Sequence, residues 1–424
     1  MKKLFAGLLA IAALAGGGWI ATDRAGFDRA EWLSDYQQLK TAVEQQYANL
    51  QWSRSSKNVD LVALNETALQ QLRSAGSKSD ARRALETFVA GFNDGHFHIE
   101  RDPPRLVAKV MSWFNRSPNA SIDFAMSAAD VCGALGFGEK GHTLAVEDAA
   151  PMRSTTFAAG LLTTNSGRKI GVVRIPLFRQ REYRSVCENR WPQFQDGKTG
   201  ICDERCQGRF GVHVKHELAQ ALADDARALV AMGAASIVID LTGNGGGTEW
   251  AEYAAAALSA KPLRPPAVWL IRAISDSAAV TCDLSQLWQN RNAQPPCWNA
   301  VPSPREPEEV QSYARPYTGP LYIMTDANTA SASEQFAATL RDNNAALTIG
   351  TRTMGIGCGF VDGGNPVRLR YSRLVVWMPN CARFRADGTN EFEGVKPDFP
   401  VDWGSDEKSR TEALLEFFDA IPRS

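Results

Sequence analysis

The feature that most constrains the fold is an alternation of strand and helix patterns after residue 167. The β-branched runs GRKIGVVRIPLF (167–178) and ASIVID (235–240) flank HVKHELAQALADDARALVAMG, whose apolar residues recur with a helical period. The order continues with WAEYAAAALSA as helix, AVWLIRAI and LYIMTD as strands, ASEQFAATLRDN as helix and ALTIG as strand. Because strands that alternate with helices form a parallel sheet with helical cover, the pattern predicts an α/β core over residues 167–424.

The N-terminal third has a different pattern. In residues 22–100, EWLSDYQQLKTAVEQQY and SDARRALETFVAGF space their apolar residues by three and four, which predicts a helical domain, and Ser79-Asp80 is expected to cap its second helix. Residues 101–166 show no clear period and are expected to form an irregular connecting or cover segment.

Residues 1–21 have the pattern of a targeting segment. Lys2 and Lys3 precede an apolar run from Leu4 to Ala15, and Ala13-Leu14-Ala15 matches a small-x-small cleavage site. The alternative is an uncleaved membrane anchor that continues to Ala21. Both interpretations predict an exported protein, periplasmic or secreted, with membrane association only through an uncleaved N-terminal segment.

The cysteines and the charge restrict the partners further. Eight cysteines behind a signal peptide predict disulfides, with Cys282–Cys297 and Cys358–Cys381 suggested by their spacing and Cys132, Cys187, Cys202 and Cys206 left to pair among themselves. A zinc site at Cys202, Cys206, His213 and His216 is the less favoured alternative, and we predict no metal. A formal net charge of -1 gives no basic footprint for nucleic acid.

Two strand-to-helix junctions carry residues suited to chemistry. In IVIDLTGNGGGTEWAEY, glycines 245–247 lead from a buried strand into a helix and would leave backbone N–H groups open to an anion or an oxyanion. In LYIMTDANTASASEQFAATL, Ser331 stands where the next helix begins. Ser331-x-x-Glu334 matches a capping box, so Ser331 is either a helix cap or a nucleophile beside the free amide of Ala332.

Taken together, DLTGNGGG, TASASEQFAATLRDNNAALTIGTRTMG and the closing EGVKPDFPVDW resemble the carboxyl-terminal-processing and tricorn-like serine peptidases of family S41. The resemblance implies a crotonase-like (ClpP/crotonase) α/β core, no cofactor, and Ser331 as nucleophile. It also implies an oxyanion hole formed by the backbone of Gly246 or Gly247 and by Ala332, with Ser333 structural. No PDZ domain is evident, so cleavage of C-terminal tails is not implied.

The sequence departs from the tail-specific branch at its general base. Where that branch has a lysine, GTRTMGIGCG has Ile356, which cannot accept a proton. The tricorn-like branch uses an upstream histidine, and NDGHFHIE places His96 at that position, with His98 as its rival. The resemblance assigns the supporting carboxylate to Glu391, with Glu393 and Asp94 as competitors.

These features predict an exported serine endopeptidase that hydrolyses peptide or protein substrates with Ser331, His96 and Glu391. The alternative is a catalytically inactive ligand- or lipid-binding protein on the same fold, related to retinoid-binding modules. An acyl-CoA enzyme of the crotonase type is a more distant possibility, since an exported protein would rarely meet that substrate.

Overall fold

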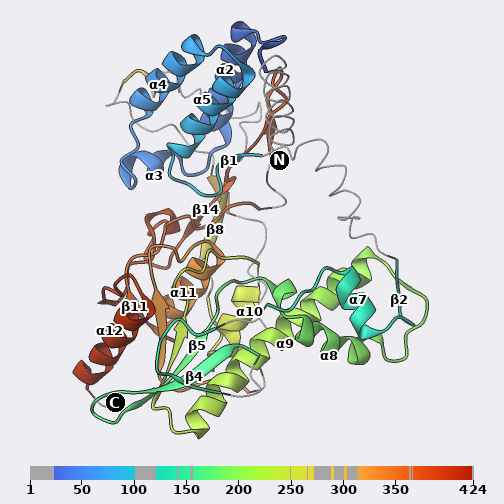
Figure 1. The fold of residues 1–424 in the computed structure, drawn as a ribbon, viewed down its shortest axis with the longest axis vertical. Coiled ribbons are helices and arrows are strands. Elements are labelled where there is room, and N and C mark those ends of the chain that lie inside the picture. The colour runs from blue at the N-terminus through green and yellow to red at the C-terminus, as the bar shows by residue number, and fades with distance from the viewer. Residues whose placement is uncertain are drawn as a thin grey trace, which may run out of the picture. The chain divides into compact units, whose positions relative to one another are not determined.

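The computed structural model describes residues 23–100, 121–140, 143–152, 156–248, 250–264, 266–271, 288–290, 300–302, 313, 315–361, 364 and 366–422. The chain divides into two compact units (Figure 1). The first comprises Met1–Arg101, Trp269–Pro302 and Cys358–Ala382, and the second comprises Asp102–Val268, Ser303–Gly357 and Arg383–Ser424. The predicted signal peptide lies outside the described residues.

Within the described residues, the first unit contains four helices and a small sheet. Its buried side chains include Tyr36, Leu39, Leu85 and Phe88, which recur along the inner faces of two helices and form one apolar core with residues of the small sheet. Its elements are α2 (Arg29–Gln46), α3 (Leu50–Ser55), α4 (Leu61–Ser74), α5 (Lys78–Ala90), β1 (His98–Ile99), β12 (Val367–Arg368) and β13 (Val375–Trp377), the strands lying in the order β1-β13-β12.

The cap of α5 differs from the expected one. Ser77, not Ser79-Asp80, is the N-cap, and its side chain accepts the N–H of Asp80. Ser79 is already inside the helix, where its hydroxyl donates to Asp23. Because a capping oxygen bonds the N–H two or three positions ahead, Ser77 is the residue placed to reach Asp80.

A seven-stranded sheet forms the centre of the second unit. Its first five strands are parallel and its last two pairings are antiparallel. β7 is buried along its whole length and β5 is buried except at its two end residues, as expected for parallel strands covered on both faces. The strand order is β15 (Phe399–Pro400), β11 (Leu347–Gly350), β10 (Leu321–Thr325), β7 (Ser236–Asp240), β5 (Lys169–Arg174), β4 (Ala158–Thr163) and β3 (Ala150–Pro151).

Helices cover both faces of this sheet. On one face, Val173, Ile237 and Ile239 pack in a core with α9 (Glu204–Ala231), α10 (Trp250–Ala257) and α11 (Ala332–Asp342). On the other, Val172 and Val238 pack with α12 (Glu407–Ala420). Figure 1 shows α9 running beside β4 and β5. The predicted α/β class is therefore confirmed, and the crotonase-like detail stays a prediction.

One predicted strand joins a different sheet. AVWLIRAI forms β8 (Ala267–Ile271), but it pairs with β9 (Ala300–Pro302) and β14 (Cys381–Phe384) and not with the parallel strands. An apolar run specifies a strand without specifying its partner, so the sequence pattern did not separate the two sheets. The remaining elements are β2 (Ile122–Asp123), α7 (Ala128–Ala134), η1 (Gln180–Glu182), α8 (Arg184–Gln195), β6 (Ile201–Cys202) and η3 (Glu391–Glu393).

Three disulfides lie among the described residues: Cys132–Cys187, Cys202–Cys206 and Cys358–Cys381. The Cys358–Cys381 prediction is confirmed, and so is the pairing of the other four cysteines among themselves. Cys282 and Cys297 lie outside the described residues. Because Cys202 and Cys206 are joined to each other, neither is a thiolate ligand, and the zinc alternative is wrong.

Candidate active site

Ser331 has a backbone conformation that helix capping alone does not require. It precedes α11 with φ 57° and ψ -117°, whereas an N-cap residue ordinarily has an extended backbone. Such angles are unfavourable for a residue with a side chain and persist only where the surrounding structure imposes them. The side chain is half-buried, so the turn presents a serine at the edge of the second unit's core.

Glu334 holds this turn in place. Its buried carboxylate accepts the Ser331 N–H at 2.8 Å, the Thr353 hydroxyl at 2.6 Å and the N–H groups of Gly355 and Ile356 at 2.7 and 3.0 Å. Burial raises the pKa of Glu334 above its ordinary value, and these hydrogen bonds oppose the rise. The carboxylate therefore joins the serine turn to the segment that contains Ile356.

Ile356 occupies the position of the tail-specific lysine. Its side chain is buried, 7% exposed, and its N–H is bound by Glu334. Any base for Ser331 must therefore come from another part of the chain.

The glycine turn after β7 packs directly on Ser331. Gly246 has φ 99°, and a Cβ placed on it would lie 2.7 Å from both the Ser331 Cβ and the Ala330 carbonyl oxygen. A side chain at this position would displace the serine, which explains the glycine in physical terms.

Asn244 organises the same turn. Its side chain is fully buried, donates to the Ile175 carbonyl at 2.7 Å and accepts the Gly246 N–H at 2.9 Å. Its backbone carbonyl accepts the Ala330 N–H at 2.9 Å. One asparagine thus joins β5's end, the glycine turn and the residue before Ser331.

Two N–H groups at this junction have no hydrogen-bond partner among the described residues. They belong to Gly247, which is exposed with φ 146°, and to Ala332, the first residue of α11. The N–H of Gly246 is already used by Asn244. Of the two glycines predicted for an oxyanion hole, Gly247 is therefore the one whose N–H could donate to an oxyanion.

Glu391 lies in η3 and forms a buried ion pair with Arg383. The Arg383 Nε donates to Oε2 at 2.5 Å, while Oε1 is buried without a partner among the described residues. Burial raises the pKa of Glu391, and the Arg383 guanidinium opposes that rise. Gly357 permits the close packing, because a Cβ there would lie 2.3 Å from the Glu391 Cβ. The competing Glu393 is half-buried, and only its backbone carbonyl contacts Arg352.

His96 belongs to the first unit, where Asp94 is the neighbouring carboxylate. Asp94 accepts the His96 N–H at 3.0 Å and the Tyr47 hydroxyl at 3.0 Å, and its Oδ1 lies 3.8 Å from the His96 Nδ1. Burial raises the pKa of Asp94, and His96 opposes the rise. The ring of His96 is packed against Gly359, where a Cβ would lie 2.6 Å from its Cδ2. His98 is exposed on β1 and its Nδ1 lies 3.0 Å from the His96 carbonyl oxygen.

Residues 169–401, more than half of the chain, match the description Peptidase family S41. The chain belongs to peptidase family S41. Among solved structures, mature CPAF complexed with lactacystin aligns with 16% identity and a TM-score of 0.58, covering 92% of this chain and 97% of that chain. Mature CPAF without that compound aligns with 16% identity and a TM-score of 0.54, covering 92% of this chain and 96% of that chain. A comparison with curated proteins finds no match.

At these identities the structural likeness of the S41 chain to CPAF concerns the fold alone. The family itself confirms the resemblance read from DLTGNGGG and the Ser331 segment, and it makes the chain a hydrolase of the peptidase class.

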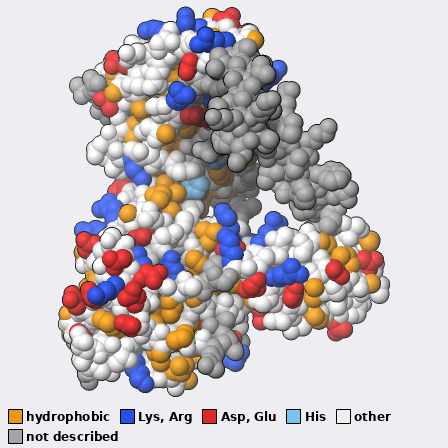
Figure 2. Space-filling model, in the orientation of Figure 1, with side chains coloured by type: hydrophobic (Ala, Val, Ile, Leu, Met, Phe, Trp, Pro, Cys, Tyr) orange, Lys and Arg blue, Asp and Glu red, His pale blue; other side chains and the backbone are white. Residues whose placement is uncertain are grey.

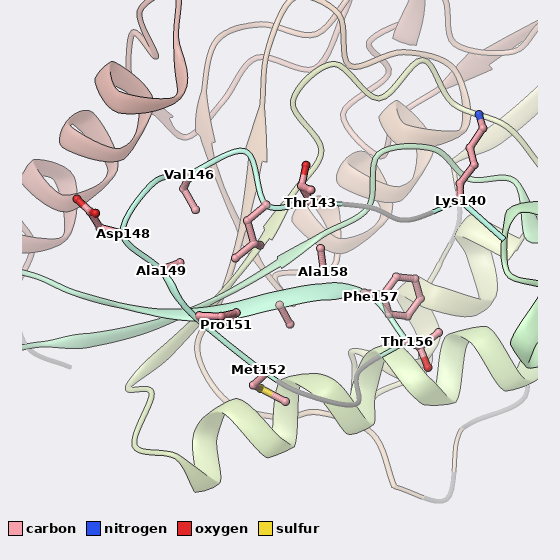
Figure 3. Close-up of a pocket in the computed structure, with 12 residues that line it drawn as sticks. Lys140, Thr143, Val146, Asp148, Ala149, Pro151, Met152, Thr156, Phe157 and Ala158 are labelled. Carbon is pink, nitrogen blue, oxygen red and sulfur yellow. The ribbon is translucent and has the colours of Figure 1, made fainter.

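A cavity of about 560 Å³ in the second unit lies away from these residues. Segment 143–152 and the start of β4 line it, and Figure 3 shows Phe157 and Thr156 at one end and Asp148 at the other. None of the predicted site residues is among its lining residues. Among the described residues no group of three or more His, Cys, Asp and Glu side chains is placed to hold a metal ion. In the same part of the chain, no helix is long and apolar enough to cross a membrane.

Sequence reasoning missed two residues of this region. Arg383 follows β-branched and aromatic sequence without any motif of its own, and only the fold brings it beside Ser331 and Glu391. Asn244 stands within DLTGNGGG, but no sequence pattern indicates that its side chain accepts the Gly246 N–H.

Proposed function

We propose that this S41 chain is a serine endopeptidase with Ser331 as nucleophile, His96 as general base and the N–H groups of Gly247 and Ala332 as oxyanion hole. The observation that carries the proposal is the Ser331 turn, in which a serine with strained backbone angles stands beside two N–H groups that have no partner among the described residues. A capping serine needs neither feature, whereas a nucleophile at a strand-to-helix turn uses both.

The proposed reaction follows from these roles. The Ser331 Oγ attacks the scissile carbonyl carbon while His96 takes the hydroxyl proton. The carbonyl oxygen becomes negative, and the two N–H groups stabilise that charge without rearranging. His96 then gives the proton to the amine as the C–N bond breaks, which leaves the acyl group as an ester on the Ser331 Oγ. Water attacks this ester while His96 takes a proton from it, and His96 returns the proton to Oγ as the acid product leaves.

The two candidate carboxylates have different surroundings. Asp94 is held by Tyr47 in the neighbourhood of His96, which suits a group that orients the imidazole. Glu391 offers a buried oxygen, Oε1, without a partner among the described residues, which supports its place in the site as a hydrogen-bond acceptor. We retain Glu391 in the proposed site and expect Asp94→Asn and Glu391→Gln to separate the two roles.

Export is the proposed location. The three disulfides among the described residues are typical of proteins that fold in an oxidising compartment. Peptides or proteins are the proposed substrates, because the family is one of peptidases. Figure 2 shows basic and acidic side chains interspersed on the visible face, with no broad patch of one sign that would favour nucleic acid.

The test is labelling of the purified mature protein by a fluorophosphonate probe. Wild type is expected to label, and Ser331→Ala and His96→Ala are expected to abolish labelling. Ser333→Ala is the matched control, since Ser333 lies on the same turn but is fully buried, and it should label like wild type. Labelling that survives Ser331→Ala would contradict the proposal. A folded wild type that never labels would favour the inactive ligand-binding alternative.

A further inference from the structure

Arg383 lies on β14 and contacts the turn that contains Ser331. Its side chain is buried, and its three nitrogens bind three different acceptors. Nε donates to Glu391 Oε2 at 2.5 Å, Nη1 to Gln335 Oε1 at 2.9 Å and Nη2 to the Ser331 carbonyl oxygen at 3.2 Å. The rigid fork of a guanidinium is suited to holding several acceptors in fixed directions.

The hydrogen bond from the Arg383 Nη2 is made to the carbonyl oxygen of the Ser331–Ala332 peptide group. The Ser331 carbonyl and the Ala332 N–H belong to the same planar, resonance-stabilised peptide bond. A cationic donor at the oxygen draws electron density from the nitrogen, so the N–H at the other end becomes a stronger donor. That N–H has no partner among the described residues and is the one assigned above to the oxyanion hole.

We propose that Arg383 is a positioning residue that orients and polarises the Ser331–Ala332 peptide and thereby strengthens the oxyanion hole. The proposal rests on the proposed function, because it assigns a purpose to the Ala332 N–H. Glu391 and Gln335 hold the guanidinium, and the Arg383–Glu391 ion pair is buried, with side chains 8% and 0% exposed.

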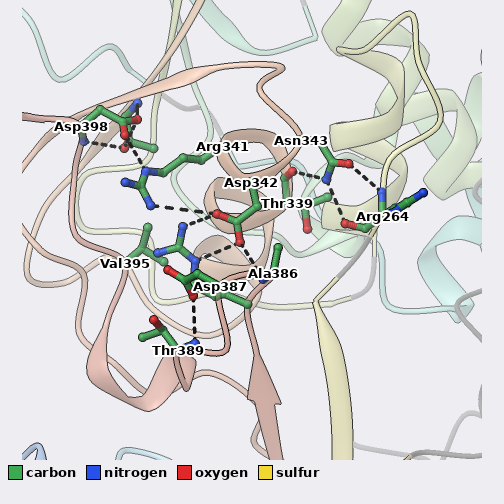
Figure 4. A network of polar contacts seen from close by, with 12 residues as sticks. Arg264, Thr339, Arg341, Asp342, Asn343, Ala386, Asp387, Thr389, Val395 and Asp398 are labelled. Carbon is green, nitrogen blue, oxygen red and sulfur yellow. Dashed lines mark hydrogen bonds and ion pairs between the residues drawn. The ribbon is translucent and has the colours of Figure 1, made fainter.

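Arg385 offers a matched control on the same stretch of chain. Both arginines are 6% exposed, and both are paired with a carboxylate. Arg385 binds Asp342, with its Nε 3.0 Å from Oδ2. Figure 4 shows Asp342 in a network with Arg341 and Asp398. The guanidinium of Arg385 donates from both Nε and Nη2 to the Asp342 carboxylate.

The variants are Arg383→Lys and Arg385→Lys, since lysine keeps the charge but its single ammonium cannot hold all three acceptors of Arg383. The first measurement is the rate constant of fluorophosphonate labelling, in which a phosphoryl oxygen takes the place of the oxyanion. Arg383→Lys should slow labelling about tenfold or more, by weakening one of two oxyanion donors. Arg385→Lys should stay within about twofold of wild type. Equal rates for Arg383→Lys and wild type would overturn the proposal.

The second measurement does not depend on activity. Labelling with ¹³C-carbonyl serine and ¹⁵N-alanine restricts the NMR spectrum to serine–alanine peptide bonds, and the Ala332 amide is assigned by its loss in Ala332→Gly. Its ¹⁵N and ¹H shifts should move in Arg383→Lys and stay in Arg385→Lys. An unchanged Ala332 amide would overturn the proposal even if labelling slowed. A shifted amide in a protein whose Ser331 never labels would support the polarised peptide while the peptidase assignment failed.

Gln335→Met provides a second variant if Arg383→Lys does not fold. It removes the Nη1 acceptor and leaves the buried ion pair with Glu391 in place. We expect it to slow labelling about threefold, because the guanidinium loses one of the bonds that aim it at Ser331. Unchanged labelling and an unchanged Ala332 amide in this variant would count against Arg383.

Discussion

The carboxylate of Glu334 accepts a hydrogen bond from the backbone N–H of Ser331, three residues before it, at 2.8 Å. This is the bond expected of a capping-box glutamate, yet Ser331 has φ 57° and lacks the extended backbone of an ordinary cap. Glu334 thus caps α11 and also joins the unusual turn at Ser331 to Thr353, Gly355 and Ile356.

Glu334→Gln should destabilise the folded chain. A glutamine offers one acceptor oxygen and points an NH₂ group toward N–H donors that now bind a carboxylate, so buried donors lose their partners. We expect the free energy of unfolding to fall by about 2–4 kcal/mol, measured by chemical denaturation. The control is Glu412→Gln, which alters a carboxylate in an exposed pair with Lys408 and should change stability by less than about 0.5 kcal/mol. Equal stability of the two variants would contradict a structural role for Glu334.

Ser331→Gly should be more stable than Ser331→Ala. Both variants remove the hydroxyl, but only glycine adopts φ 57° and ψ -117° without steric conflict. The difference should be about 1–2 kcal/mol in favour of glycine, seen as a higher Tm. If the two variants unfold together, the turn carries no backbone strain.

Gly246→Ala should impair both labelling and folding, whereas Gly245→Ala should be tolerated. A Cβ on Gly246 would lie 2.7 Å from the Ser331 Cβ, while a Cβ on Gly245 meets nothing within 4 Å. We expect Gly246→Ala to slow fluorophosphonate labelling at least about a hundredfold, since a displacement of about 1 Å at the reacting group has that effect. Comparable labelling of the two variants would show that the glycine turn does not set the position of Ser331.

Asp225→Asn should stabilise the chain above pH 6. Asp225 is buried on α9, binds the Phe157 N–H at 3.2 Å, and burial raises its pKa to about 6 from an ordinary 3.8. Between these two pKa values the folded state binds more protons than the unfolded state, so the free energy of unfolding falls as the pH rises. The contribution of Asp225 to stability is therefore complete below about pH 4 and is lost as the pH rises through about 6.

Asparagine keeps an acceptor for Phe157 and carries no charge to bury. The free energy of unfolding of the Asp225→Asn variant should exceed that of wild type by about 1–3 kcal/mol at pH 8. The difference between the two proteins should vanish near pH 4. Asp224→Asn, which changes the half-exposed neighbour paired with Arg227, should show no such trend. A constant difference at all pH values would show that Asp225 titrates normally.

Much of the second unit was predictable because its signals are local. The runs around β5, β7, β10 and β11 are apolar and β-branched, and they alternate with amphipathic helices, so the parallel sheet followed from pattern alone. β8 shows the limit of such reasoning: its sequence also specifies a strand, but its partners β9 and β14 are set by packing with distant segments.

The cap of α5 and the cysteines show the same division. Ser79-Asp80 matches a cap by residue type, but Ser77 is the residue whose oxygen reaches the free N–H. Cys358–Cys381 followed from nearness in sequence, whereas the choice of Cys132–Cys187 and Cys202–Cys206 among the four remaining cysteines required coordinates.

By itself the sequence determined the α/β class, the peptidase family and Ser331 as the candidate nucleophile, because these depend on residue type and order along short segments. The sequence also excludes a lysine general base at position 356, because that residue is Ile356. Only the tertiary structure shows that the Gly246 N–H is bound by the Asn244 side chain. It also shows that Arg383 binds both Glu391 and the Ser331 carbonyl oxygen. Hydrogen bonds between segments distant in sequence depend on angles and distances of a few tenths of an ångström, which only packing of the whole unit sets.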